Sequence, residues 1–445
     1  MRSKSETIVG RVLDAAKAAG ADSADALFVS YRSLEAAVRE GVTENIERAE
    51  GEDLGLRVFV GESQAIVSMS AFDGDTLAKA AERAVAMAKV APPDPYAGLA
   101  DPALLAERMP SLDLADATEP DEAQLLKLAV ACEAAALGVA GISKSAGAGA
   151  STGRRGVALG SSAGFLKSYE RTGYGFSVAA VAGDGVEMER DYAYSSAVHF
   201  TDLKPPEEVG REAGDRAVRR VKPRKVTSQS VPVVFDPRVA SGLVAHLAGA
   251  ISGPAIARGT SFLKDMLGKP VFSPGIVIVD DPHIKRGLGS RPFDAEGVRT
   301  ARREFVSDGV LMSWMLDHRS ARQLGLTSTG NASRGTSSPP SPSTSNLYMA
   351  NGTATPEALM AEIGSGLYVT ELMGSGVNGV TGDYSRGATG FWIENGKLAY
   401  PVSEITIAGN LKDMYRQLTP ANDLEFKSTI NAPTVRIEDM TVAGA

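Results

Sequence analysis

The chain has 445 residues, of which 43% are hydrophobic, so it is long enough to bury cores in two domains. Its formal net charge of −8 argues against direct binding of nucleic acid through a general positive field. The single cysteine, Cys132, excludes an internal disulfide and is expected to be a small buried core residue. The polar start at residues 1–6 and the lack of a long apolar run predict a cytoplasmic protein that does not contact a membrane.

The first half of the chain alternates helical and strand patterns. Apolar spacing predicts helices over residues 7–19, 75–90, 121–137 and 205–220. Alternating patterns predict strands over residues 25–31, 33–39, 54–61 and 63–68, and antiparallel strands with glycine breaks over 144–200. We therefore expect an N-terminal α/β domain over residues 1–222, with helices and a mixed or antiparallel sheet.

A short basic run, residues 219–225, contains Lys222-Pro223 and is interpreted as a solvated helix end and linker. The second domain, residues 223–445, opens with a strand over 231–235 and continues with a helix that contains His246. Short β-like runs follow at residues 275–280, 397–401 and 434–437. The sequence thus predicts an α+β fold, in which the C-terminal domain is β-rich and barrel-like.

Residues 327–345 are nearly all Ser, Thr, Gly, Pro, Asn and Arg, a composition that forms a loop. Two interpretations remain open, a mobile surface loop and a loop that covers a groove, because long loops in compact domains are often functional. The following residues, Asn346 to Met349, are predicted to form a strand that anchors this loop.

The helix around His246 has the shape of a metal site with few metal ligands. A zinc hydrolase needs two or three His, Cys or carboxylate ligands, and a carboxylate that takes the proton of the bound water. Leu247 follows His246 where a general base could stand, and Ile251 occupies the far end. His283, beside Asp280 and Asp281, is a weaker candidate, because Asp-Pro sequences usually form turns. The sequence shows no Gly-x-Ser-x-Gly elbow in a strand-turn-helix context and no Walker loop that ends in Gly-Lys-Ser/Thr.

Several ordered motifs resemble those of one known family, the TldD/PmbA family, and in particular its PmbA (TldE) branch. In the C-terminal half they are residues 250–263, 280–282, 291–297, 345–349, 377–387 and 421–426, and in the N-terminal half residues 54–59 and 91–96. Each motif is weak alone, but the ordered set is specific and covers nearly the whole chain.

The resemblance implies a zinc site that is degenerate in this chain. TldD-like members of the family carry His-Glu-x-x-x-His on a helix and a further cysteine ligand near the C-terminus. The first His matches His246, but the Glu position is Leu247 and the second His position is Ile251. No cysteine follows Cys132. The expectation is therefore that this chain holds no zinc or other cofactor and that zinc belongs only to a TldD-like partner.

The resemblance further implies a heterodimer with a TldD-like subunit, in which the partner cuts unfolded peptides and this chain is the non-catalytic subunit. A homodimer without the partner is also open. The family is linked to microcin maturation, antitoxin turnover and modulation of DNA gyrase. Because an extended peptide can pair with a strand edge, two segments are candidates to line a peptide groove. They are Asn346, Leu347, Tyr348 and Met349, and the turn Gly374, Ser375 and Gly376.

Two other functions stay open at the level of sequence. The chain could be a hydrolase with an unrecognised site near His283. It could also be a non-proteolytic binding or regulatory protein that acts on a macromolecular partner.

Overall fold

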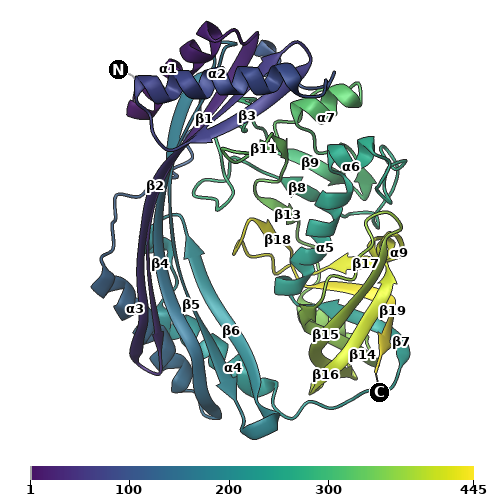
Figure 1. Cartoon of the computed structure of the whole chain (residues 1–445). Helices are drawn as coiled ribbons and strands as arrows, with labels where there is room; N and C mark the ends of the chain where they lie inside the picture. The colour runs from purple at the N-terminus through teal and green to yellow at the C-terminus, as the bar shows by residue number, and fades with distance from the viewer. Residues whose placement is uncertain (1–2, 445) are drawn as a thin grey trace.

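The computed structural model describes residues 3–444 and begins with a long, curved sheet that forms one wall of the molecule (Figure 1). Its strands run in the order β3-β2-β1-β4-β5-β6, and all neighbours are antiparallel. The strands are β1 (Ser23–Arg39), β2 (Val42–Val60), β3 (Ser63–Met69), β4 (Ile142–Ser161), β5 (Leu166–Ala182) and β6 (Glu189–Ala197). A two-residue turn joins β1 to β2, and both of its residues, Glu40 and Gly41, have the positive φ that such turns require.

Two pairs of helices cover opposite ends of this sheet. The helices α1 (Lys4–Ala18) and α2 (Gly74–Val90) pack on one end. At the other end pack α3 (Glu122–Leu137) and α4 (Pro206–Arg219). Cys132 is fully buried between α3 and the sheet, as predicted, and burial raises the pKa of its thiol to about 12. The thiol is therefore inert core packing.

The C-terminal unit is built around a closed five-stranded barrel and a second, open sheet. The barrel strands are β7 (Gln229–Phe235), β14 (Ser365–Met373), β15 (Asp383–Glu394), β16 (Lys397–Asn410) and β19 (Val435–Ala443), with β17 (Leu418–Pro420) attached to β19. Pairing of β16 with β19 closes the barrel. The open sheet has the order β10-β9-β8-β13-β18, with β8 (Ile278–Asp280), β9 (Arg303–Ser307), β10 (Val310–Leu311), β13 (Leu347–Met349) and β18 (Ile430–Asn431).

Short elements complete the C-terminal unit. The helix α5 (Pro237–Ala250) contacts both the barrel strand β14 and the strands β13 and β18 of the open sheet. The remaining elements are α6 (Gly253–Ala257), α7 (His318–Gln323), α8 (Pro356–Ala361), α9 (Leu411–Arg416), and the strand pair β11 (Ala332–Ser333) and β12 (Ser341–Pro342). The predicted α+β class with a β-rich, barrel-like C-terminal part is confirmed. The boundary at residues 222 and 223 stays a prediction.

Two strands are longer than the sequence pattern indicates. Residues 25–31 and 33–39 form one continuous strand, β1, and β2 begins at Val42 rather than near residue 54. The first half of β2 is almost wholly exposed, so it lacks the alternation of buried and exposed residues that marks a strand in a sequence. Its strand form comes from pairing with β1.

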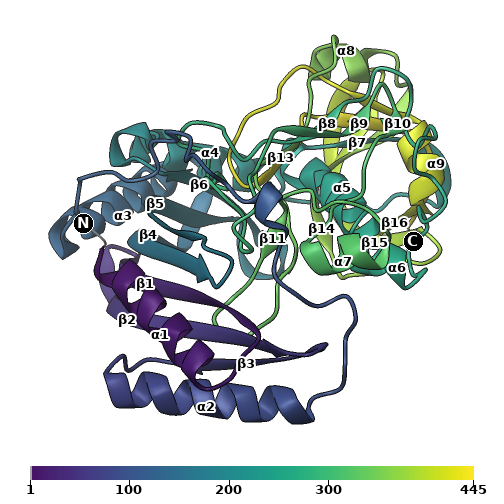
Figure 2. The ribbon, with the colours of Figure 1, turned by 90° about the horizontal axis from the view of Figure 1, so that it is seen from above.

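The C-terminal unit lies beside the sheet (Figures 1 and 2), and two of the interactions that join them involve buried aspartates of the sheet. At the end near α1, Asp25 of β1 bonds to Arg334, which follows β11. At the end near α4, Asp191 of β6 bonds to Arg238 of α5. No helix within residues 3–444 is both long enough and apolar enough to cross a bilayer.

Candidate functional site

The helix α5 is fixed at its start by a cap and along one face by the core. Asp236 accepts a hydrogen bond from the backbone N–H of Arg238, and Pro237 occupies the first helical turn. The side chains of one face are buried, namely Ala240, Leu243, Val244, Leu247, Ala248 and Ala250. The opposite face carries small residues, and a Cβ added at Gly242 or Gly249 would meet open space.

The two degenerate positions of the zinc motif lie on the buried face. Leu247 is 0% exposed and Ile251 is 1% exposed, and both belong to the largest apolar core of the chain. Around the helix axis, His246 is rotated by about 100° from Leu247 and by about 140° from Ile251. Within residues 3–444, no group of three or more His, Cys, Asp or Glu side chains has the proximity needed to hold a metal ion.

His246, on α5, is partly buried against the barrel strand β15. Its ring meets the ring of Tyr384 edge-on, with 6.1 Å between the centroids. Burial lowers the pKa of His246, and the nearby guanidinium of Arg386 lowers it further, so the ring is neutral at pH 7. Arg386 also donates a hydrogen bond to the carbonyl of Met373. The structure thus brings His246 close to the turn that contains Gly374.

The first candidate segment for a peptide groove is part of the open sheet. The strand β13 pairs with β8 on one side and with β18 on the other, so it has no free edge. Asn346, Leu347 and Met349 are buried, and Tyr348 is partly exposed beside Phe426. The amide of Asn346 bonds to the backbone of Gly289 and Asp281 and to the hydroxyl of Ser290, which fixes a neighbouring turn. That this segment lines a groove stays a prediction. Tyr348 is the residue of the segment whose side chain a ligand could reach at the surface.

The second candidate segment, Gly374, Ser375 and Gly376, forms an exposed turn between β14 and β15. A positive φ at Gly374 and the close approach of Gly376 to the backbone of Ser385 explain why glycine stands at both positions. Its exposure leaves the turn accessible to a ligand, and its lining role stays a prediction.

The residues around His283 serve the local structure. Asp281 accepts a hydrogen bond from the backbone N–H of His283 at 2.9 Å, which is the turn expected of an Asp-Pro sequence. The His283 ring bonds to the hydroxyl of Thr300 at 2.9 Å. Asp280 is buried and accepts hydrogen bonds from Ser345 and Asn331. These two carboxylates therefore already have structural partners.

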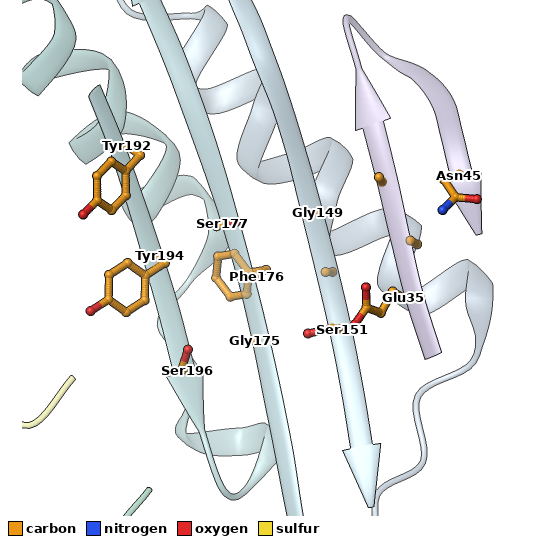
Figure 3. Close-up of a pocket in the computed structure, with 13 residues that line it drawn as sticks. Glu35, Asn45, Gly149, Ser151, Gly175, Phe176, Ser177, Tyr192, Tyr194 and Ser196 are labelled. Carbon is orange, nitrogen blue, oxygen red and sulfur yellow. The ribbon is translucent and has the colours of Figure 1, made fainter. Parts of the chain in front are cut away.

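A pocket of about 550 Å³ lies on the face of the long sheet that α3 and α4 leave open (Figure 3). Its floor consists of small residues on β1, β4 and β5, and the rings of Tyr192 and Tyr194 stand along β6 at one side. The two rings are stacked, with centroids 6.4 Å apart. We call this surface the tyrosine groove. The residues that line its floor and sides include Glu35, Gly149, Ser151, Gly175, Ser177, Tyr192, Tyr194 and Ser196.

The tyrosine groove continues toward α5. A second pocket of about 240 Å³ shares Tyr192 and Tyr194 with it and extends to Asp236, Arg238 and Ser241 at the start of α5. The guanidinium of Arg238 lies over the Tyr192 ring at 5.6 Å. The two pockets therefore form one path from the middle of the sheet to the helix that carries His246.

The loop over residues 327–345 packs against the long sheet. Its Arg334 donates a hydrogen bond of 2.6 Å to Asp25, and the Arg334 side chain is only 2% exposed. A Cβ at Gly55 of β2 would overlap the Thr336 carbonyl, so glycine is required there for the loop to approach. Of the two interpretations drawn from the sequence, the mobile surface loop is wrong for the part around Arg334.

A buried charged cluster, defined as Asp25, Arg57, Glu296 and Arg334, joins this loop to the sheet, and the sequence pattern did not indicate it. Asp25 bonds to Arg57 as well as to Arg334. Burial would raise the pKa of Asp25, but the charges of Arg334 and Arg57 hold it below its usual value. Burial and the charge of neighbouring Asp294 raise the pKa of Glu296. In the sequence, Asp25 is the one charged residue in the otherwise apolar run 24–29, all of which is buried.

Known proteins match the chain from end to end. Three family models cover consecutive segments, described as PmbA/TldA metallopeptidase domain 1 (residues 24–88), central domain (residues 115–221) and C-terminal domain (residues 228–444). The protein named metalloprotease PmbA of Escherichia coli O157:H7 is 41% identical over 427 residues, which cover 95% of this chain and 92% of that protein. A homolog from Haemophilus influenzae is 38% identical over 439 residues, 98% of this chain and 95% of that protein.

Solved structures have the same fold. A Bacteroides thetaiotaomicron protein, described as a candidate modulator of DNA gyrase, superimposes with a TM-score of 0.92 and 27% identity over 100% of both chains. TldE from Thermococcus kodakarensis superimposes with a TM-score of 0.88 and 21% identity over 98% of this chain and 100% of that one. From these matches and the shared fold, the chain belongs to the PmbA/TldE family.

Proposed function

We propose that this chain is the non-catalytic subunit of a cytoplasmic TldD/TldE-type zinc metalloprotease complex that degrades or processes unfolded peptides. Family membership supports a role in proteolysis, because the 41% identical relative is named a metalloprotease. The observation that carries the proposal is the position of Leu247 and Ile251 in the apolar core. Neither side chain can bind zinc or accept a proton, and a single imidazole is not enough to hold the ion.

The proposed role for this chain is to complete a peptide chamber beside a TldD-like catalytic subunit. The tyrosine groove suits an extended peptide, because small floor residues leave room for a backbone and Ser151, Ser177 and Ser196 offer hydroxyl partners. Tyr192 is 41% exposed and supplies a rigid apolar contact at the junction with α5.

The complex is tested by co-expression with a TldD-like subunit from the same organism. We expect the two chains to co-purify, and cleavage of an unstructured peptide to require both and to stop on addition of a chelator. The chain alone should contain far less than stoichiometric zinc by metal analysis. About one tightly bound zinc per isolated chain, or the absence of any stable complex, would contradict the proposal.

The groove is tested with two tyrosines of nearly equal exposure, Tyr192 at 41% and Tyr31 at 43%. Tyr192→Ala should lower the kcat/KM of the complex by about fivefold to thirtyfold, since a lost aromatic contact costs about 1–2 kcal/mol. Tyr31→Ala, which lies outside the tyrosine groove, should leave it unchanged. Equal effects of the two substitutions, with the complex intact by size-exclusion chromatography, would remove the groove from the proposal.

A further inference from the structure

A small cavity of about 130 Å³ lies at the seam between the long sheet and the C-terminal unit. The sheet contributes apolar residues and two arginines from β1, β4 and β5, and the C-terminal unit contributes the segments around Phe293 and Arg334. We call it the arginine pocket, because four guanidinium groups line it. They belong to Arg155, Arg171, Arg291 and Arg334.

Buried guanidinium atoms in this pocket lack hydrogen-bond partners. Arg334 uses Nη1 to bond to Asp25, but its Nε and Nη2 are buried and have no partner within the described residues. Arg291 donates from Nη2 to the carbonyl of Ser343, and its buried Nε likewise finds no acceptor there. Buried donors without acceptors cost about 1–3 kcal/mol each, and more for charged groups. The unpartnered donors therefore lie in the wall of the pocket, on two side chains that line it.

The wall of the pocket that the long sheet forms carries two positive charges close together. Arg155 of β4 and Arg171 of β5 stand directly opposite each other in the antiparallel register. Like charges at such paired positions are unfavourable. Arg171 donates a hydrogen bond to the Leu288 carbonyl, while the side chain of Arg155 is exposed and makes no hydrogen bond or ion pair to any residue within 3–444. Burial lowers the pKa of Arg171, and the charge of Arg155 lowers it further.

The lining contains one carboxylate, Asp294, and its oxygens are already used. They accept hydrogen bonds from the backbone N–H groups of Glu296, Val298 and Ala332, at 2.9, 2.8 and 3.1 Å. Burial also raises the pKa of Asp294 to about 6. Arg334 is paired with Asp25, and Arg291 lies near Asp294, so Arg155 and Arg171 are the guanidinium groups of the lining that have no ion pair within the described residues.

We propose that the arginine pocket binds a small oxyanion, a phosphate or carboxylate group, between Arg155, Arg171, Arg291 and Arg334. Guanidinium groups present paired N–H donors that match the oxygens of such anions. The volume far exceeds the 10–15 Å³ or so that one water needs, yet it is well below the roughly 300 Å³ at which pockets for larger ligands begin. Because the pocket lies at the seam, the bound anion holds the sheet against the C-terminal unit.

The experiment compares anions on the full chain at matched ionic strength. Inorganic phosphate and acetate are each titrated against a chloride baseline, with thermal unfolding and isothermal titration calorimetry as readouts. We expect a saturable rise of Tm and a measurable heat with at least one of the two oxyanions. Tighter binding of phosphate would identify a phosphate site, and tighter binding of acetate a carboxylate site.

Neighbouring arginines on β4 supply matched variants. Arg155→Gln removes one of the four guanidinium groups that line the arginine pocket. Because the Arg155 side chain is exposed and makes no hydrogen bond or ion pair, the fold is retained. It should weaken oxyanion binding by about tenfold to a hundredfold, as expected for one charge-assisted hydrogen bond. Arg154→Gln removes the same charge one residue away, where the side chain bonds to Glu170 and lines a different pocket. It should bind the oxyanion as the unsubstituted chain does.

Two results would overturn the proposal. One is a response of the unsubstituted chain to phosphate and acetate that equals its response to chloride. The other is equal oxyanion affinity in the Arg155→Gln and Arg154→Gln variants, with both folded by circular dichroism. Neither result depends on a partner subunit or on peptide cleavage, so the outcome is separate from that of the proposed function.

Discussion

At the scale of single residues, α5 accounts for the proposed absence of catalysis by this chain. The side chains at 240, 243, 244, 247, 248 and 251 follow the spacing of a buried helical stripe, and all are in the core. Leu247 and Ile251 occupy the positions that the family resemblance assigns to a general base and a second ligand, and here both are core packing. His246 lies outside the stripe, so its ring is only partly buried. That burial and the charge of Arg386 lower its pKa and keep the ring neutral.

Leu247→Ala should lower the free energy of unfolding by about 2–5 kcal/mol, because it opens a cavity in a fully buried site. Gly249→Ala, two residues away on the open face, should be neutral or stabilising by up to about 1 kcal/mol, since alanine favours the helix. Urea unfolding of both variants measures this difference. A Leu247→Ala variant as stable as the unsubstituted chain would show that the side chain is not core packing.

At the scale of elements, the loop over residues 327–345 differs most from what the sequence pattern predicts. Its composition correctly predicted a loop. Its contacts depend on one arginine that reaches Asp25, about 300 residues earlier in the chain, and on a glycine of β2 that allows the approach. Such long-range pairs leave no periodic signal. The strand at residues 347–349 was predicted, but its central place in the open sheet was not, because pairing partners are distant in sequence.

The charged cluster makes this loop sensitive to substitution. Asp25→Asn leaves Arg57 and Arg334 buried without their carboxylate, which should cost about 3–5 kcal/mol. The same variant should be cut faster within residues 327–345 by limited proteolysis. Arg32→Gln breaks an ion pair with Glu119 whose side chains are 53% and 59% exposed, and it should change stability by less than about 1 kcal/mol. Equal effects of the two substitutions would argue against the cluster as the anchor of the loop.

At the scale of the whole molecule, buried carboxylates near opposite ends of the long sheet hold it to the C-terminal unit. Asp25 pairs with Arg57 and Arg334, and Asp191 pairs with Arg238 and Arg220. Burial would raise the pKa of each carboxyl, but the arginines outweigh burial and lower both. A lowered pKa in the folded state means that the unfolded chain takes up protons first on acidification.

The contribution of these carboxylates to stability should therefore be complete above the ordinary Asp pKa of about 3.9 and be lost as pH falls below it. Burial raises the pKa of Glu296 to about 8, so its contribution is complete below the ordinary Glu pKa of about 4.3 and is lost as pH rises through about 8. On acidification from pH 6 this contribution therefore grows until about pH 4, and the loss from the aspartates follows below that pH. Small-angle scattering between pH 6 and pH 3 should record an increase in the radius of gyration as the units separate. An Asp25→Asn and Asp191→Asn double variant should have a weaker dependence on pH, and an unchanged dependence would contradict the assignment.

The sequence by itself determined the α+β class, most helices, the barrel-like second half, the buried Cys132 and the family, because these follow from local periodicity, composition and ordered motifs. It also contained the apolar stripe that buries Leu247 and Ile251. Only the tertiary structure decided where β13 lies, how the tyrosine groove meets α5, and which arginines face one another at the seam. Those features depend on contacts between residues that are far apart in the chain, and burial and charge at such contacts are set by the packing of complete elements.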